Sequence, residues 1–208
     1  MIEYNKRPKN LGSFACQVEE YMTYIYLPIH IPNMVSPIFE QRLKVFEKII
    51  GAACCDFIGD FGLDRYMESY VYVTAKHQFQ KLGSGFNRPG WHSDGFMTDD
   101  ISYVWSNKQP TIFNDTCFLL SQNDTLSMDQ MEEQAKPEKN YSFPNESLLR
   151  MDQYSIHKVA EYEGGNRAFV KICFSKDKYN LCGNSINYEI DYNWEFKKRL
   201  AIRNIPQQ

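Results

Sequence analysis

The run ISYVWSNKQPTIFNDTCFLLS, residues 101–121, gives the clearest indication of the fold class of this chain. It contains three short runs of aliphatic and aromatic residues, and residues typical of turns separate these runs. Short runs of this kind are typical of β-strands that follow one another closely along the chain. Residues 101–121 therefore predict several short strands joined by tight connections.

Strand-like segments also lie on both sides of residues 101–121. Residues 13–31 and 66–79 are rich in aromatic and β-branched side chains, which favour strands. Residues 147–175 are interpreted as strand, hairpin and strand, with the hairpin turn at EGGN, residues 163–166. The run KLGSGFNRPG, residues 81–90, is predicted to be a loop because it is rich in Gly, Asn and Pro.

One amphipathic helix is predicted between the first two strand regions. Its apolar residues recur at spacings of 4, 3, 4 and 3, which is typical of one buried helix face: Phe39, Leu43, Phe46, Ile50 and Ala53. Ser36 is a suitable N-cap, and Pro37 suits the first helical turn. One helix followed by many short strands favours an antiparallel sandwich or barrel with a helical layer outside it.

A long polar segment, residues 121–147, follows these short strands. It is predicted to be a mobile loop or a short helix with the role of a lid over a site. An ordinary surface insertion explains the same composition equally well, so the sequence leaves both alternatives open.

Composition and charge limit the classes of function. The chain has 208 residues, of which 43% are hydrophobic, and this suits a single domain with a sizeable core. A net charge of −3 provides no electrostatic case for wrapping a nucleic-acid backbone, although it is compatible with a local basic groove. The six cysteines form no C-x-x-C pair, which argues against a zinc site of that kind and against a disulfide framework. No apolar leader and no membrane-length apolar run is present, which predicts a cytoplasmic protein.

The motif GWHSDGF, residues 90–96, places a histidine and an aspartate two positions apart in a loop. Residues at positions i and i+2 of an extended segment point to the same side, so His92 and Asp94 can serve as two ligands of one metal ion. Two imidazoles and one carboxylate on one face of a metal form the site of non-haem iron(II) oxygenases. A third ligand must then come from a distant strand.

His157 is the candidate for the third ligand, and Arg167 follows it by ten positions. Arginine suits a planar carboxylate because its guanidinium donates two parallel hydrogen bonds. Arg167 stands at the head of the alternating, largely apolar run AFVKICF, so its side chain can point inward, toward the mouth of a barrel. Each of these residues alone has an ordinary structural explanation, and the conjunction of all four indicates a site.

With these motifs, the chain resembles the iron(II)- and 2-oxoglutarate-dependent dioxygenase superfamily. The similarity covers roughly residues 66–175, and WHSDGF and IHKVAEYEGGNRAFVKICF carry it. The second motif resembles the branch that includes plant oxygenases and prolyl hydroxylases. The resemblance implies a double-stranded β-helix, or jelly roll, within one domain: an N-terminal strand and helix layer over about residues 1–65, and a core over about 66–190. It also implies iron bound by His92, Asp94 and His157, and the distal carboxylate of 2-oxoglutarate held by Arg167.

The chain departs from this family pattern at one position. Many members of the branch carry a serine two residues after the arginine, and here that residue is Phe169. Another group must then help to hold the co-substrate, and Tyr103 is the candidate because it lies on the strand that follows the H-x-D motif. An ordinary aromatic residue of the sheet is an equally good interpretation of Tyr103.

The resemblance implies an oxidoreductase that couples oxidative decarboxylation of 2-oxoglutarate to hydroxylation, or a related oxidation, of a substrate that the sequence does not identify. Its expected partners are Fe(II), 2-oxoglutarate and O2. Two alternatives stay open: a jelly-roll binding module without metal, and a cupin-like metalloenzyme that does not use 2-oxoglutarate. Metal binding separates the first alternative from the oxygenase, and dependence on 2-oxoglutarate separates the second.

Overall fold

The computed structural model describes residues 1–83, 89–161 and 163–199. Within these ranges the protein is β-rich, with mostly antiparallel sheets and few helices. This confirms the predicted mainly β class with flanking helices. The middle of the predicted loop at 81–90, residues 84–88, lies outside the described residues.

The largest sheet has six strands, and all neighbouring strands in it are antiparallel. Their spatial order is β2 (Lys9–Ser13), β9 (Ser147–Met151), β5 (Ile101–Ser106), β11 (Gly165–Ser175), β4 (Tyr70–Gln80) and β3 (Met22–His30). The strand β11 pairs with both β4 and β5, and nearly all of its residues are buried. Burial on both faces explains why its sequence is largely apolar.

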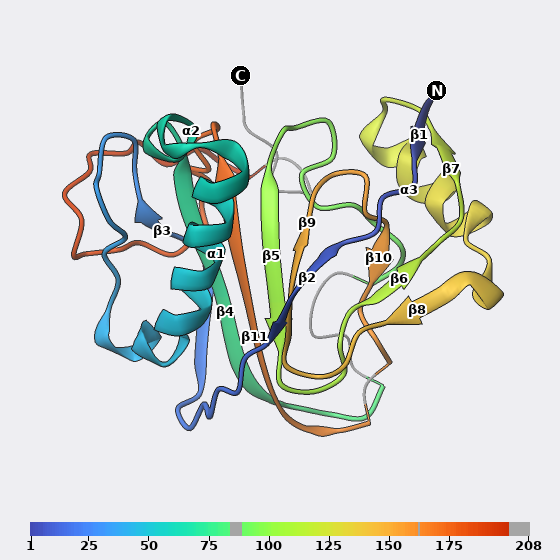
Figure 1. The fold of residues 1–208 in the computed structure, drawn as a ribbon, viewed down its shortest axis with the longest axis horizontal. Helices are drawn as coiled ribbons and strands as arrows, with labels where there is room; N and C mark the ends of the chain where they lie inside the picture. Colours follow the sequence, from blue (N-terminus) through green and yellow to red (C-terminus); the bar gives the residue numbers. More distant parts are fainter. Residues whose placement is uncertain (84–88, 162, 200–208) are drawn as a thin grey trace.

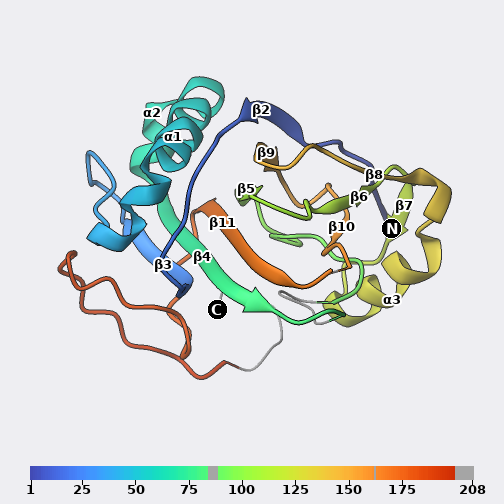
Figure 2. The ribbon, with the colours of Figure 1, turned by 90° about the horizontal axis from the view of Figure 1, so that it is seen from below.

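A smaller sheet contains three strands in the order β10 (His157–Lys158), β6 (Ile112–Asn114) and β8 (Asn140–Ser142). The strands β1 (Ile2–Tyr4) and β7 (Phe118–Leu120) pair antiparallel in a separate two-stranded sheet. In Figure 2, α1 and α2 lie outside the curved layer of β4 and β11, and β6 and β10 lie on the other side of it. The three strands predicted from residues 101–121 are β5, β6 and β7, and they are found.

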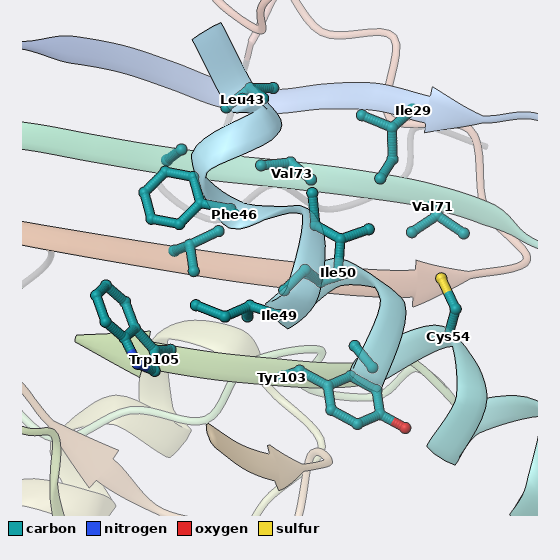
Figure 3. Packing of buried hydrophobic residues seen from close by; sticks show 14 of the residues in the cluster. Ile29, Leu43, Phe46, Ile49, Ile50, Cys54, Val71, Val73, Tyr103 and Trp105 are labelled. Atoms are coloured by element: carbon teal, nitrogen blue, oxygen red, sulfur yellow. The ribbon is translucent and has the colours of Figure 1, made fainter. Parts of the chain in front are cut away.

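The helical layer begins later and continues further than predicted. It consists of a 3₁₀ helix, Gln41–Phe46, followed by α1 (Glu47–Phe61) and α2 (Leu63–Met67). The predicted cap at Ser36 is wrong, because the backbone N–H of Ile38 donates to the carbonyl of Ile29 and keeps this segment beside β3. The predicted apolar face is confirmed, since four of its five residues are buried and Phe39 is partly buried against the same core. Figure 3 shows residues of this layer packed over the large sheet.

The polar segment 121–147 contains α3 (Asp124–Gln134), a short 3₁₀ helix (Pro137–Lys139) and β8. The side chain of Asn123 caps α3 by accepting a hydrogen bond from the backbone N–H of Leu126. The alternative of a short helix is therefore confirmed, while the strand β8 was not predicted. In Figure 1, α3 lies beside β1 and β7 at the end of the molecule opposite α1.

The predicted hairpin at EGGN is wrong. The strand β10 pairs with β6 in the smaller sheet, whereas β11 pairs with β4 and β5 in the larger one. The EGGN segment therefore connects two different sheets. Both edges of β11 are paired over residues 169–174, with β4 on one side and β5 on the other, so this part of β11 has no free edge for β10.

No helix among the described residues combines the length and the apolar character needed to cross a membrane.

Candidate metal centre

Two histidines from distant parts of the sequence face each other at one edge of the smaller sheet. His92 and His157 form an isolated antiparallel bridge in which each backbone N–H donates to the other's carbonyl at 2.9 Å. Their rings lie 4.5 Å apart between centroids, and both side chains are buried. The bridge fixes the two rings side by side, because paired residues of antiparallel strands project their side chains to the same face.

A backbone carbonyl sets the tautomer of each histidine. The Nδ1 atom of His92 lies 2.9 Å from the carbonyl oxygen of Gly90, and that of His157 lies 2.9 Å from the carbonyl oxygen of Ser155. A carbonyl oxygen only accepts hydrogen bonds, so the proton of each neutral ring resides on Nδ1. Each Nε2 is then the unprotonated nitrogen, which is the form that binds a metal.

Asp94 completes the group from the turn that follows His92. One ligand atom from each of His92, Asp94 and His157 can be chosen so that all three lie within 4.8 Å of one another. The oxygen Oδ2 of Asp94 lies 3.8 Å from Nε2 of His157. Two neutral imidazoles and one carboxylate at this spacing fit a first-row divalent metal, with ligand distances of about 2.0–2.2 Å.

Lys171 also reaches this group, and the sequence interpretation did not include it. Its Nζ atom lies 3.1 Å from Oδ2 of Asp94 and 3.0 Å from the hydroxyl of Tyr26. Lys171 is only 8% exposed, so its charge requires partners of this kind. A lysine in the middle of the apolar run AFVKICF is the sequence signal that could have identified it.

The charges in this group shift one another's pKa. Burial alone would raise the pKa of Asp94, but the ammonium of Lys171 lowers it, and the pKa of this carboxyl lies well below its ordinary range. Burial opposes the charge of Lys171, but Asp94 raises the pKa of the lysine above its usual value. Burial raises the pKa of Tyr26 to about 12, so its hydroxyl stays protonated near neutral pH. The group thus contains a stable carboxylate paired with a stable ammonium.

Arg167 is buried on the same face of β11 as Lys171, because residues four apart in a strand share a face. Its Nε donates to the carbonyl of Lys108 at 2.9 Å, and its Nη2 donates to the carbonyl of Gln109 at 3.1 Å. Its guanidinium carbon lies 5.4 Å from the ring centroid of Phe169. The rise of a strand separates the Cα atoms of Arg167 and Lys171 by about 13 Å, so Arg167 lies beside the triad and not within it.

Tyr103 does not face this group, and the prediction that it holds the co-substrate is wrong. It pairs with Ile172 across β5 and β11, and its hydroxyl donates to Oδ2 of Asp56 on α1 at 2.8 Å. Figure 3 shows Tyr103 and Trp105 packed with residues of the helical layer. The error has a physical cause: every residue of β5 is buried, so alternation alone does not identify which face meets the helices.

Comparison with known proteins does not identify a family for this chain. No protein-family model and no curated protein matches the chain. Among solved structures, it is similar to EvdO2 from Micromonospora carbonacea var. aurantiaca, with 13% identity, a TM-score of 0.41, and coverage of 67% of this chain and 68% of that chain. The same values apply to a structure of EvdO2 complexed with 2-oxoglutarate. A likeness with so low a TM-score does not bear on function, so the functional case depends on the site itself.

Proposed function

We propose that this protein is a metal-dependent oxygenase that uses 2-oxoglutarate as its co-substrate. The observation that carries the proposal is the convergence of His92, Asp94 and His157, whose ligand atoms can all lie within 4.8 Å of one another. Both histidines present Nε2 as the unprotonated nitrogen, because backbone carbonyls accept from Nδ1. This arrangement suits iron(II) and leaves other positions of the metal for a co-substrate and oxygen.

The strand order supports a jelly roll as the fold of the proposed enzyme. One sheet contains β9, β5, β11 and β4 in sequence across it, and β10, β6 and β8 form the other. The bridge from His92 to His157 adds a fourth segment to the smaller sheet. Four neighbouring antiparallel strands within the six-stranded sheet and four antiparallel segments in the smaller sheet are the arrangement expected of a double-stranded β-helix.

Iron and 2-oxoglutarate, when bound, would supply the oxidising chemistry of the reaction. The chain's own residues have different tasks. The triad would hold the metal, and Arg167 would hold the distal carboxylate of 2-oxoglutarate with its buried guanidinium. Phe113, whose ring lies 5.8 Å from the ring of His157, would limit the access of water on that side of the triad. The reaction class is hydroxylation or a related oxidation.

A second candidate function is a binding module that uses no metal. The ion pair of Lys171 with Asp94 favours it, because the carboxylate already has a positive partner. In that case the buried ion pair would stabilise the fold, and the protein would bind a ligand without catalysing a reaction. A metal titration separates the two candidates.

The test is an anaerobic titration of the purified protein with Fe(II), followed by admission of O2 and assay of the succinate formed from 2-oxoglutarate. We expect the wild type to bind one equivalent of metal and His92→Ala to lose that binding. His77→Ala is the matched control, since His77 is also buried and its Nδ1 also lies beside a backbone carbonyl, that of Glu20, but it is outside the triad. Metal binding that survives in His92→Ala would contradict the proposed ligand set. Metal binding without 2-oxoglutarate turnover would favour a metalloenzyme of another kind.

Arg167→Ala tests the role of 2-oxoglutarate specifically. We expect the variant to keep its affinity for iron, because Arg167 is not a ligand, and to bind 2-oxoglutarate more weakly by about 2–5 kcal/mol, the range for truncating one partner of a buried charge pair. Calorimetric titration of 2-oxoglutarate into the iron-loaded protein without oxygen measures this. Arg42→Ala is the control, because Arg42 is exposed and pairs with Glu20 on the surface. Wild-type affinity in Arg167→Ala would mean that another residue holds the carboxylate.

A further inference from the structure

The carboxylate oxygen that faces His157 also has a cationic neighbour. The Oδ2 atom of Asp94 lies 3.8 Å from Nε2 of His157 and 3.1 Å from Nζ of Lys171. If Asp94 is a metal ligand, this oxygen is the one directed toward the other ligands. The metal and the lysine ammonium would then share a single oxygen atom.

Lys171 is held in this position from the other side by Tyr26. The Tyr26 hydroxyl lies 3.0 Å from Nζ, and Nζ lies 4.9 Å from the centre of the tyrosine ring. Tyr26 has a φ of 47°, a left-handed conformation that an aromatic residue rarely adopts, at a register shift of β3 between Tyr24 and Leu27. Such a backbone conformation is unfavourable, so the surrounding structure must hold Tyr26 in place. In this conformation the Tyr26 hydroxyl contacts the buried ammonium of Lys171.

The ion pair of Lys171 with Asp94 stabilises the buried carboxylate in the metal-free protein. A carboxylate in a largely buried position is costly without a positive partner, and the side chain of Asp94 is only 22% exposed. A divalent ion about 2.1 Å from the same oxygen would bring two further positive charges next to the ammonium. Like charges this close repel strongly in a partly desolvated site.

We propose that Lys171 is a built-in competitor of the metal: its ammonium neutralises Asp94 in the metal-free protein, and a divalent cation binds only as this ammonium withdraws from the carboxylate. The inference rests on the proposed function, because it takes the triad as the metal site. It adds a role for Lys171 and Tyr26, which set how tightly the metal binds. The chain thereby keeps its carboxylate paired in both states.

The experiment compares Co(II) binding by the wild type, Lys171→Met and Lys158→Met. Methionine has an unbranched side chain one heavy atom shorter than that of lysine and carries no charge. Lys171→Met should therefore bind Co(II) at least about tenfold more tightly, the low end of the coupling measured for close charge pairs. Lys158 is the matched control, because it neighbours His157 but its Nζ lies over the ring of Trp91, 4.7 Å from the centroid. Its removal should change the affinity by less than about threefold. The double variant His92→Ala with Lys171→Met should lose the tight binding.

A second measurement tests the pair in the metal-free protein. Urea unfolding of Lys171→Met, Asp94→Asn and the double variant should show a lower midpoint for each single change and a loss in the double variant smaller than the sum. Purely additive losses would overturn the claim that Lys171 neutralises Asp94, and this result does not depend on metal binding.

The outcomes distinguish the inference from the proposed function. Equal Co(II) affinity in the wild type and Lys171→Met overturns the inference and leaves the metal-dependent function standing. Binding by Lys171→Met alone supports the inference and overturns the proposed function, because Lys171 then excludes the metal from the natural protein. Binding by neither protein overturns both.

Discussion

Among single residues, Gly95 determines the position of Asp94, which it follows in the chain. Gly95 has a φ of 66°, and a Cβ atom there would lie 2.9 Å from Cβ of Asp100 and 2.9 Å from Oγ1 of Thr98. A left-handed φ and contacts this short exclude a side chain without movement of the turn. Because the turn carries Asp94, its movement would displace a proposed ligand.

Gly95→Ala is therefore expected to lower the free energy of unfolding by about 1–3 kcal/mol and to weaken metal binding. Urea denaturation and a Co(II) titration measure the two effects. Gly51→Ala is the control, since Gly51 lies within α1 and an added methyl group there would meet no neighbouring atom within 4 Å, and alanine should stabilise the helix by about 0.5–1 kcal/mol. The same response to both substitutions would contradict the role assigned to the turn.

Among the elements, α3 supports the segment that carries His92. The backbone N–H of Trp91 donates to the carboxylate of Glu132 on α3 at 3.2 Å, and Met131 packs in one cluster with Trp91 and Phe96. The helix and the histidine segment are thus joined by both a charge-assisted hydrogen bond and apolar contact. A lid role for residues 121–147 stays a prediction, and these contacts require that any opening of α3 also loosen the segment of Trp91.

Glu132→Ala should lower the stability of the protein by about 1 kcal/mol, since it leaves the Trp91 amide without its carboxylate partner. Hydrogen exchange should show faster exchange of the Trp91 and His92 amides, with little change in β11. Glu133→Ala, a change at the adjacent exposed residue of the same helix, serves as the control. Unchanged exchange at Trp91 in Glu132→Ala would show that the apolar contact alone holds the segment.

In the molecule as a whole, the proposed metal joins segments that are far apart in the sequence. His92 and Asp94 precede β5, whereas His157 lies on β10 in the smaller sheet. An unfolded chain does not hold these residues together, so metal binding stabilises the folded state selectively. The size of this effect follows from the metal concentration relative to its dissociation constant.

A metal concentration of about 100 times the dissociation constant should add about 2.7 kcal/mol, which raises the melting temperature by about 5–10 °C for a chain of this length. Thermal unfolding with and without Co(II), monitored by circular dichroism, measures the shift. Addition of a chelator should reverse it, and His92→Ala should show none. A shift of equal size in His92→Ala would place the metal elsewhere.

Features that depend on local pattern could be predicted from the amino-acid sequence. The run ISYVWS forms β5 at the residues expected, and the apolar spacing from Phe39 to Ala53 marks the buried face of the helical layer. The H-x-D motif and the distal His157 could also be selected in advance, because ligand chemistry restricts which residue types serve a metal. Local sequence carries this information because strand and helix periods are properties of a few consecutive residues.

The folded chain was needed to learn which side of the sheet each residue meets and which strands are partners. Tyr103 and Lys171 both lie on buried strands, where alternation separates two faces but does not say which one packs against helices and which one faces the triad. The strand β10 was expected to pair with β11 and pairs with β6 instead. Which strands pair, and which layer each face of a sheet meets, depends on how segments far apart in the sequence pack together. The local sequence pattern does not contain this information, so only the three-dimensional structure revealed the contact of Lys171 with Asp94.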